Sequence, residues 1–176
     1  MKKIITSIFV LFIGLLVVTG CEKEDNKQSS AEKVDSVDDL TNKSGTLNCT
    51  RQGYANGDIK PSFSYTVTYR DGELLTLRAI EEVSSESGTG LDEYYSAYLK
   101  IDEKYKGLKY YDSKVLKTDN SVTRDTTIDY EHIDIDKLLH IEGNEDNIID
   151  ENGKASLEMW LALAKRFGTV CNESSN

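Results

Sequence analysis

The chain has 176 residues, with 31 acidic against 21 basic side chains and a formal net charge of −10 at pH 7. This acidic balance argues against nucleic acid as a partner, because phosphate binding requires clustered lysine and arginine. The length suits one domain with its own hydrophobic core behind a short N-terminal extension.

The first 21 residues have the layout of an export signal. A positive Met-Lys-Lys precedes an apolar stretch of 15 residues, 4–18, which is shorter than the roughly 20 residues that span a bilayer. Val18-Thr19-Gly20-Cys21 then resembles the bacterial lipobox. The resemblance implies cleavage between Gly20 and Cys21 and a diacylglyceryl group on the Cys21 thiol. The alternatives are an uncleaved helix and a plain signal peptide with an incidental cysteine.

The expected organisation follows from this leader. Residues 1–20 are a cleaved lipoprotein signal peptide, residues 21–45 are the lipidated cysteine and a flexible tether, and residues 46–176 are a single extracytoplasmic domain. The tether is expected because residues 22–45 hold only four apolar side chains, too few to offset the entropy lost on ordering. We therefore expect a protein held at the membrane through diacylglyceryl-Cys21, on the extracytoplasmic face.

The first part of the domain has the pattern of strands. Residues 46–53 are a short strand and residues 54–61 a loop rich in turn formers. Aromatic and apolar residues then alternate with small polar ones from Ser62 to Tyr69, a period of two. Asp71-Gly72 follows as a strong turn signal. The spacing predicts an antiparallel hairpin over residues 62–84.

A helical period comes next. Thr89, with Asp92 three residues on, is a variant of the capping box, and Gly107 is a suitable stop. The expected apolar face consists of Leu91, Tyr94, Tyr95, Tyr98, Leu99 and Tyr105. We expect these tyrosines to pack the helix on a sheet; the alternative is an aromatic surface for a sugar or peptide.

The rest of the chain is expected to form a second hairpin, two helices and a last strand. Two β-rich segments flank Asp119-Asn120 and predict a second hairpin, and Asp134 is placed to cap a short helix that runs to Leu139. A helix over residues 154–167 has an apolar stripe and a stop at Gly168. The segment around Cys171 is expected as a last edge strand.

This order predicts an α+β fold, with an antiparallel sheet built from two hairpins and two main helices packed on one face. A doubly wound parallel sheet is excluded, because strands and helices do not alternate one by one.

Three segments carry a family resemblance: "EKYKGLKYYDSKV", "DTTIDYEHIDIDKL" and "SLEMWLALAKRFG". In motifs and in their order, the chain from Phe63 to Gly168 resembles small bacterial lipoproteins of the YehR-like family. The resemblance implies export and an α+β fold, and it implies no reaction, since the family has no established biochemical role. Cys49 and Cys171 are not part of the family pattern.

Cys49 and Cys171 are the two cysteines left once Cys21 is lipidated. An even pair in an exported domain favours a disulfide, here between the two ends of the domain, over two free thiols. A catalytic thiol is not expected, because the chain has no CxxC motif and His140, the nearest histidine to either cysteine, is 31 residues from Cys171.

No motif predicts a catalytic residue, a metal site or a cofactor. The acidic loop 142–152 fails the EF-hand spacing, since Ile148 and Met159 fall where acids are needed; whether the loop binds a cation in a looser way stays open. His132 and His140 are expected to be structural.

The favoured function is a binding or interaction module at the cell envelope, whose partner is an unidentified envelope protein, peptide or glycan. The alternative is an envelope hydrolase that acts on cell-wall carbohydrate or peptide. A solvent-facing set of acids with one raised pKa in a cleft would favour the hydrolase.

Overall fold

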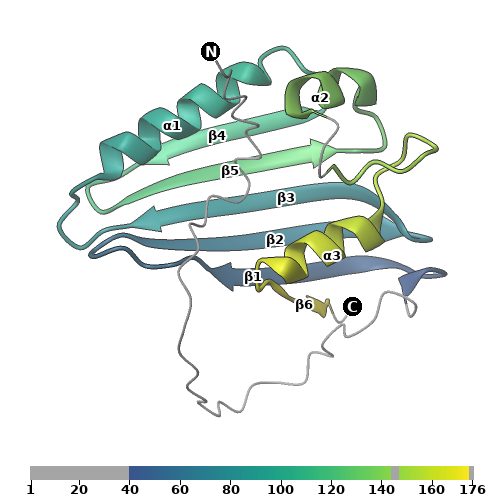
Figure 1. Ribbon diagram of the computed structural model, residues 1–176, viewed down its shortest axis with the longest axis horizontal. Helices are drawn as coiled ribbons and strands as arrows, with labels where there is room; N and C mark the ends of the chain where they lie inside the picture. The colour runs from purple at the N-terminus through teal and green to yellow at the C-terminus, as the bar shows by residue number, and fades with distance from the viewer. Residues whose placement is uncertain (1–39, 144–146, 175–176) are drawn as a thin grey trace, which may run out of the picture.

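The computed structural model describes residues 40–143 and 147–174. In these residues six strands form one open antiparallel sheet in the order β4-β5-β3-β2-β1-β6, with three helices beside it (Figure 1), so the fold class is α+β. The elements are β1 (Ser44–Gln52), β2 (Lys60–Arg70), β3 (Glu73–Ser84), α1 (Leu91–Lys104), β4 (Tyr111–Lys117), β5 (Ser121–Asp129), α2 (Ile135–Glu142), α3 (Leu157–Arg166) and β6 (Val170–Glu173).

The turn between β2 and β3 lies at Asp71-Gly72. Both residues have positive φ, 51° and 79°, as the two central residues of a type I′ turn require. The two strands pair antiparallel from Arg70 opposite Glu73 onward, with a register shift at Thr68/Tyr69. The type I′ twist matches the right-handed twist of the strands, so the turn fixes the register.

Alternate residues of the strands supply the core, as their period of two requires. In β3 these are Leu77, Ala79, Glu81 and Val83, and opposite them in β5 are Ile128, Thr126, Arg124 and Val122. All eight are buried. Glu81 and Arg124 interrupt an otherwise mostly apolar pattern.

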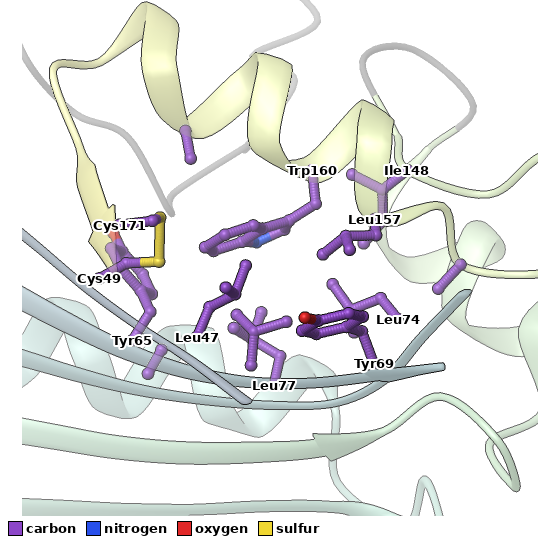
Figure 2. Close-up of a cluster of buried hydrophobic side chains, with 14 of the residues drawn as sticks. Leu47, Cys49, Tyr65, Tyr69, Leu74, Leu77, Ile148, Leu157, Trp160 and Cys171 are labelled. Carbon is purple, nitrogen blue, oxygen red and sulfur yellow. A yellow bond between two sulfur atoms is a disulfide. The ribbon is translucent and has the colours of Figure 1, made fainter. Parts of the chain in front are cut away.

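Helix α3 packs over β1 and β2 (Figure 2). Trp160 meets the edge of Tyr65 with ring centroids 5.7 Å apart, and Leu157 is fully buried, which contributes about 1.5–3 kcal/mol. Ser156 caps the helix by accepting from the Met159 backbone N–H. The Leu157 N–H donates to the Gly72 carbonyl oxygen, 3.0 Å away, and so joins the start of α3 to the β2–β3 turn.

Helices α1 and α2 lie toward the β4 side of the sheet (Figure 1). The buried residues of α1, Leu91, Tyr98 and Ile101, pack with Val83 and Val122. The expected apolar face of α1 is wrong at Leu99, which is 45% exposed. The expected Thr89 cap is also wrong: the N-cap is Gly90, at φ 83° and without a side-chain cap.

Helix α2 begins at the expected cap, since the Asp134 carboxylate accepts from the Lys137 backbone N–H at 3.1 Å. It continues to Glu142, three residues beyond the expected end.

Part of the expected tether belongs to the domain. Leu40 is 1% exposed and packs in the α3 cluster, and β1 already begins at Ser44, which pairs with Arg70. Residues 40–45 are therefore ordered by one buried leucine and a strand ladder. The rest of the predicted tether and the signal peptide lie outside the described residues. Within residues 40–143 and 147–174, no helix is long and apolar enough to cross a membrane.

Candidate functional site

The predicted disulfide is present: Cys49 and Cys171 are bonded, with their Cα atoms 4.0 Å apart. The two residues are directly opposite in the β1–β6 ladder, and both are buried next to Tyr65 and Trp160 (Figure 2). The bond joins the first and last strands of the domain. The predicted lipidation residue Cys21 and the cleavage residue Gly20 lie outside the described residues, so they stay predictions.

His132 is exposed and its Nδ1 lies 2.8 Å from Asp129 Oδ2. The hydrogen bond to that carboxylate raises the pKa of His132. The ring stacks on Tyr110, with centroids 5.3 Å apart. Over the described part of the chain, no three His, Cys, Asp or Glu side chains are grouped so that they could hold a metal ion.

The acidic loop has a structural explanation in its described part. The Asp150 carboxylate accepts from the backbone N–H groups of Asn152 and Lys154, at 2.8 and 2.9 Å. Both hydrogen bonds lower the pKa of Asp150, and the bond from Lys154 has the larger effect. A depression of about 540 Å³ beside it is lined by Asp71, Glu73 and Glu158 among others, and Lys154 pairs with Glu73. Asp150 thus shapes the turn before α3.

A buried charged cluster lies at the middle of the sheet. Arg124 of β5 is 4% exposed and Glu81 of β3 is 1% exposed. The Arg124 guanidinium donates through Nε to Asp102 Oδ1 of α1 at 2.8 Å, and through Nη2 to the Tyr111 hydroxyl of β4 at 2.6 Å. Its Nη1 lies 3.4 Å from Glu81 Oε2. We call these four residues the Arg124 centre.

Strand register brings the centre together. Glu81 and Arg124 are directly opposite in the β3–β5 ladder, so both side chains point to the same face. A charge buried without a partner costs several kcal/mol, whereas a charge paired with hydrogen bonds is tolerated. Asp102 is held further by the Ser113 hydroxyl, which donates to its Oδ2 at 2.9 Å.

Burial and charge act against each other in this centre. Burial raises the pKa of Glu81, and Arg124 opposes this by lowering it; the net direction is upward. Burial also raises the pKa of the Tyr111 hydroxyl to about 12, against the nearby Arg124 charge. The guanidinium stays charged and is the fixed positive partner of both carboxyls.

One oxygen of the centre has no partner. Glu81 Oε1 is buried and accepts no hydrogen bond, although Glu81 Oε2 faces Arg124. On the other side of Glu81, its cross-strand neighbour is Phe63 of β2. The Arg51 guanidinium lies over the Phe63 ring, 3.8 Å from the centroid, and 5.7 Å from that of Phe167. Glu81 therefore lies between two arginines.

A second branch connects the centre to α2. The Tyr111 ring stacks on Tyr105 with centroids 4.2 Å apart and planes within 3°. The Tyr105 hydroxyl donates to Glu142 Oε1 at 3.0 Å. Burial raises the pKa of Glu142, and the Tyr105 hydrogen bond opposes this. Of the two carboxyls with raised pKa values, Glu81 is buried and Glu142 is half-buried, and each interacts with a neighbouring side chain.

Sequence reasoning missed Glu81, Arg124 and Asp102. A signal was present in the strands, because Glu81 and Arg124 fall on the inward positions of the period of two. Charged residues at such positions indicate an internal pair. That they pair with each other depends on the register of β3 with β5, two strands separated in the chain by α1 and β4.

Comparison with known proteins supports the fold. The chain matches no protein-family model and no curated protein. It is similar to the NMR structure of the Escherichia coli YehR protein, with a TM-score of 0.54 and 17% identity, over 77% of this chain and 95% of that one. The predicted resemblance is thereby confirmed as a likeness of fold. An NMR structure of a protein from Streptococcus pneumoniae TIGR4 matches at 15% identity and TM-score 0.45, over 90% of this chain and 100% of that one.

Proposed function

We propose that this chain is a lipid-anchored extracytoplasmic protein that serves as a binding module at the cell envelope. The buried Cys49–Cys171 disulfide carries the proposal, because such bonds persist in oxidising, exported compartments. The lipobox at residues 18–21 agrees with it and supplies the anchor. One disulfide within the domain and one acylated cysteine outside it account for all three cysteines.

We also propose the finer architecture: hairpins β2–β3 and β4–β5 build the sheet, and the main helices α1 and α3 cover one face. Two sets of contacts support it. Leu77 and Ala79 pack in the α3 cluster, whereas Val83 and Val122 pack in the α1 cluster. Residues 77, 79 and 83 lie on the same side of β3, since they are separated by even numbers of residues.

The burial of the Arg124 centre argues against the hydrolase alternative. A general acid at the envelope needs a carboxyl of raised pKa that reaches its substrate. Glu81 and Glu142 have raised pKa values, yet Glu81 is buried against Arg124, and the half-buried Glu142 accepts a hydrogen bond from the Tyr105 hydroxyl. The Arg124 centre instead holds α1, β3, β4 and β5 together.

The anchor is tested by expressing the full chain and its Cys21→Ala variant in a bacterial host and separating membranes from soluble protein. We expect the wild-type chain in the membrane fraction and the Cys21→Ala chain unprocessed or lost from it. Ser29→Ala is the matched control, since it is a similarly small change outside the lipobox. Equal membrane association of the wild-type and Cys21→Ala chains after signal removal contradicts the proposal.

A further inference from the structure

Strand β4 ends the sheet and has an open edge. The Asp129 N–H donates to the Tyr110 carbonyl oxygen at 2.9 Å, and the Thr118 N–H donates to the Ser121 carbonyl oxygen at 2.8 Å. Residues that bond the neighbouring strand alternate in an antiparallel ladder, so the even-numbered residues of β4 bond β5. The odd-numbered residues within 111–117 therefore direct their N–H and C=O groups away from β5, and no strand in the described part of the chain pairs with them there.

Helix α1 follows this edge on one face of the sheet (Figure 1). Near the start of α1, Asp92 pairs with Lys117. Near its end, Asp102 accepts a hydrogen bond from the Ser113 hydroxyl at 2.9 Å. Leu99 follows Asp92 by two helical turns and precedes Asp102 by one, so it lies on the same side of α1 as both. Because Leu99 is 45% exposed, it is an uncovered apolar side chain beside the open edge.

The position of α1 limits what can pair with this edge. A second copy that paired through its own β4 would bring its α1 onto the same face, because the two-fold axis between antiparallel strands is perpendicular to the sheet. Paired strands lie about 4.8 Å apart, whereas packed helices need about 8–10 Å between their axes. Two helices that each follow their own β4 would therefore collide. A single extended segment brings no helix and avoids the collision.

The exposed face of β4 determines which charges such a segment should carry. Asp112 and Lys114 alternate with the inward residues and are exposed. On the β5 side, Lys114 lies opposite Asp125, and Asp112 lies opposite the uncharged Thr127. Both oxygens of Asp125 already accept hydrogen bonds from Arg78. On the open side, an acid opposite Lys114 and a base opposite Asp112 would stabilise an added strand, and the reverse order would destabilise it.

We propose that the open edge of β4 binds an extended peptide segment of a partner protein as an added antiparallel strand. In this segment an acidic residue pairs with Lys114 and a basic residue pairs with Asp112. The alternate residues are apolar and face Leu99 and Val115, which packs against the α1 cluster. The antiparallel direction continues that of the described strand pairs. This assignment rests on the proposed function, a binding module, and adds the site and the chemistry of its partner.

Two matched peptides test the site on the chain from residue 21 onward, made with Cys21→Ala and its disulfide intact. Acetyl-Thr-Thr-Val-Glu-Val-Lys-Val-amide has the proposed order of charges, and acetyl-Thr-Thr-Val-Lys-Val-Glu-Val-amide has the charges exchanged. Each is titrated while backbone amide chemical shifts are followed. We expect saturable shifts at Tyr111, Ser113 and Val115 with the first peptide, and an affinity about ten-fold lower for the second. N-methylation of the middle valine of the first peptide removes a ladder donor and should abolish binding.

A charge exchange in the protein gives the second arm. The double variant Asp112→Lys, Lys114→Asp keeps the net charge and should reverse the preference between the two peptides. The control Glu73→Lys, Lys154→Glu exchanges an ion pair at the start of β3 and should leave the preference unchanged.

Equal affinities for the two peptides, a preference for the exchanged one, or shifts away from β4 only would overturn the proposal. A dimer of the free chain joined through β4, detected by sedimentation and by slowed hydrogen exchange of the Tyr111 and Val115 amides, would also overturn it. If the anchor test succeeds and neither peptide binds, the edge site is wrong and the proposed anchoring stands.

Discussion

Arg124 is the residue on which the buried charges depend. It contacts a carboxylate from β3, a carboxylate from α1 and a hydroxyl from β4, and so joins three elements at one point. The arrangement fixes how α1 sits over β5, because the guanidinium fork holds its partners in set directions.

Removing the cation should therefore be costly. We expect Arg124→Met to lower the free energy of unfolding by about 3–5 kcal/mol, since Glu81 and Asp102 are left buried without their partner. The double variant Arg124→Met, Glu81→Leu should lose less than the single one. Urea denaturation of both variants measures this. Equal losses of unfolding free energy in the single and double variants would mean that Arg124 and Glu81 are not energetically coupled.

Glu81 should make stability depend on pH. Its pKa is raised above the usual 4.5, mainly by burial. A carboxyl with a higher pKa in the folded state stabilises the protein below its unfolded-state pKa, and this contribution is lost as pH rises through the folded-state value. Glu81→Gln removes that loss. When the pH is raised from below 4.5 to neutral, we expect the free energy of unfolding of Glu81→Gln to fall less than that of the wild-type protein. Glu82→Gln should show the same fall as the wild-type protein.

The elements depend on a few special backbone positions. Gly88 and Gly107 both have positive φ, 72° and 83°. A Cβ on Gly88 would lie 2.6 Å from the Asp119 carbonyl oxygen, whereas a Cβ on Gly107 would meet nothing within 4 Å. Gly88 therefore allows the loop before α1 to touch the β4–β5 turn.

Alanine substitutions at these two glycines distinguish the cost of backbone strain from the cost of a steric clash. Gly107→Ala should cost about 1–2 kcal/mol, the strain of a left-handed alanine. Gly88→Ala should cost more, because backbone atoms must also move apart. Thermal unfolding of the two variants side by side tests the difference, and a larger effect at Gly107 would argue against the contact with Asp119.

The edge strand β6 depends on the disulfide. It has four residues, and Val170 is 45% exposed, so little apolar burial holds it. Cys49→Ser should lower the free energy of unfolding by about 2–5 kcal/mol, and Cys49→Ser, Cys171→Ser should be no worse than either single change. A stability equal to wild type in non-reducing buffer would show that β6 holds itself.

The sequence predicts the turns and helix caps that depend on local residues. It does not predict contacts between residues that are far apart in the chain. The Asp71-Gly72 turn and the Asp134 cap lie where local chemistry predicts them. Leu40 was missed because its partners come from α3 and β2, far along the chain. The Glu81–Arg124 pair was missed for the same reason: 43 positions separate the two residues, and only strand register brings them together.

At the scale of the whole molecule, the described chain is an α+β domain that includes Leu40, and we propose that a lipidated Cys21 anchors it. Eighteen residues, 22–39, separate Cys21 from Leu40 in the sequence. The proposed cleavage removes Lys2 and Lys3 and no acid, so the mature chain would have a net charge of −12.

Mass spectrometry of the mature N-terminus tests the central claim most directly. The full chain is expressed in a bacterial host, purified from membranes, and its N-terminal peptide is fragmented. We predict that residues 1–20 are absent and that Cys21 is the first residue and carries a diacylglyceryl group. An unmodified Cys21, or an N-terminus at any other residue, would contradict the account.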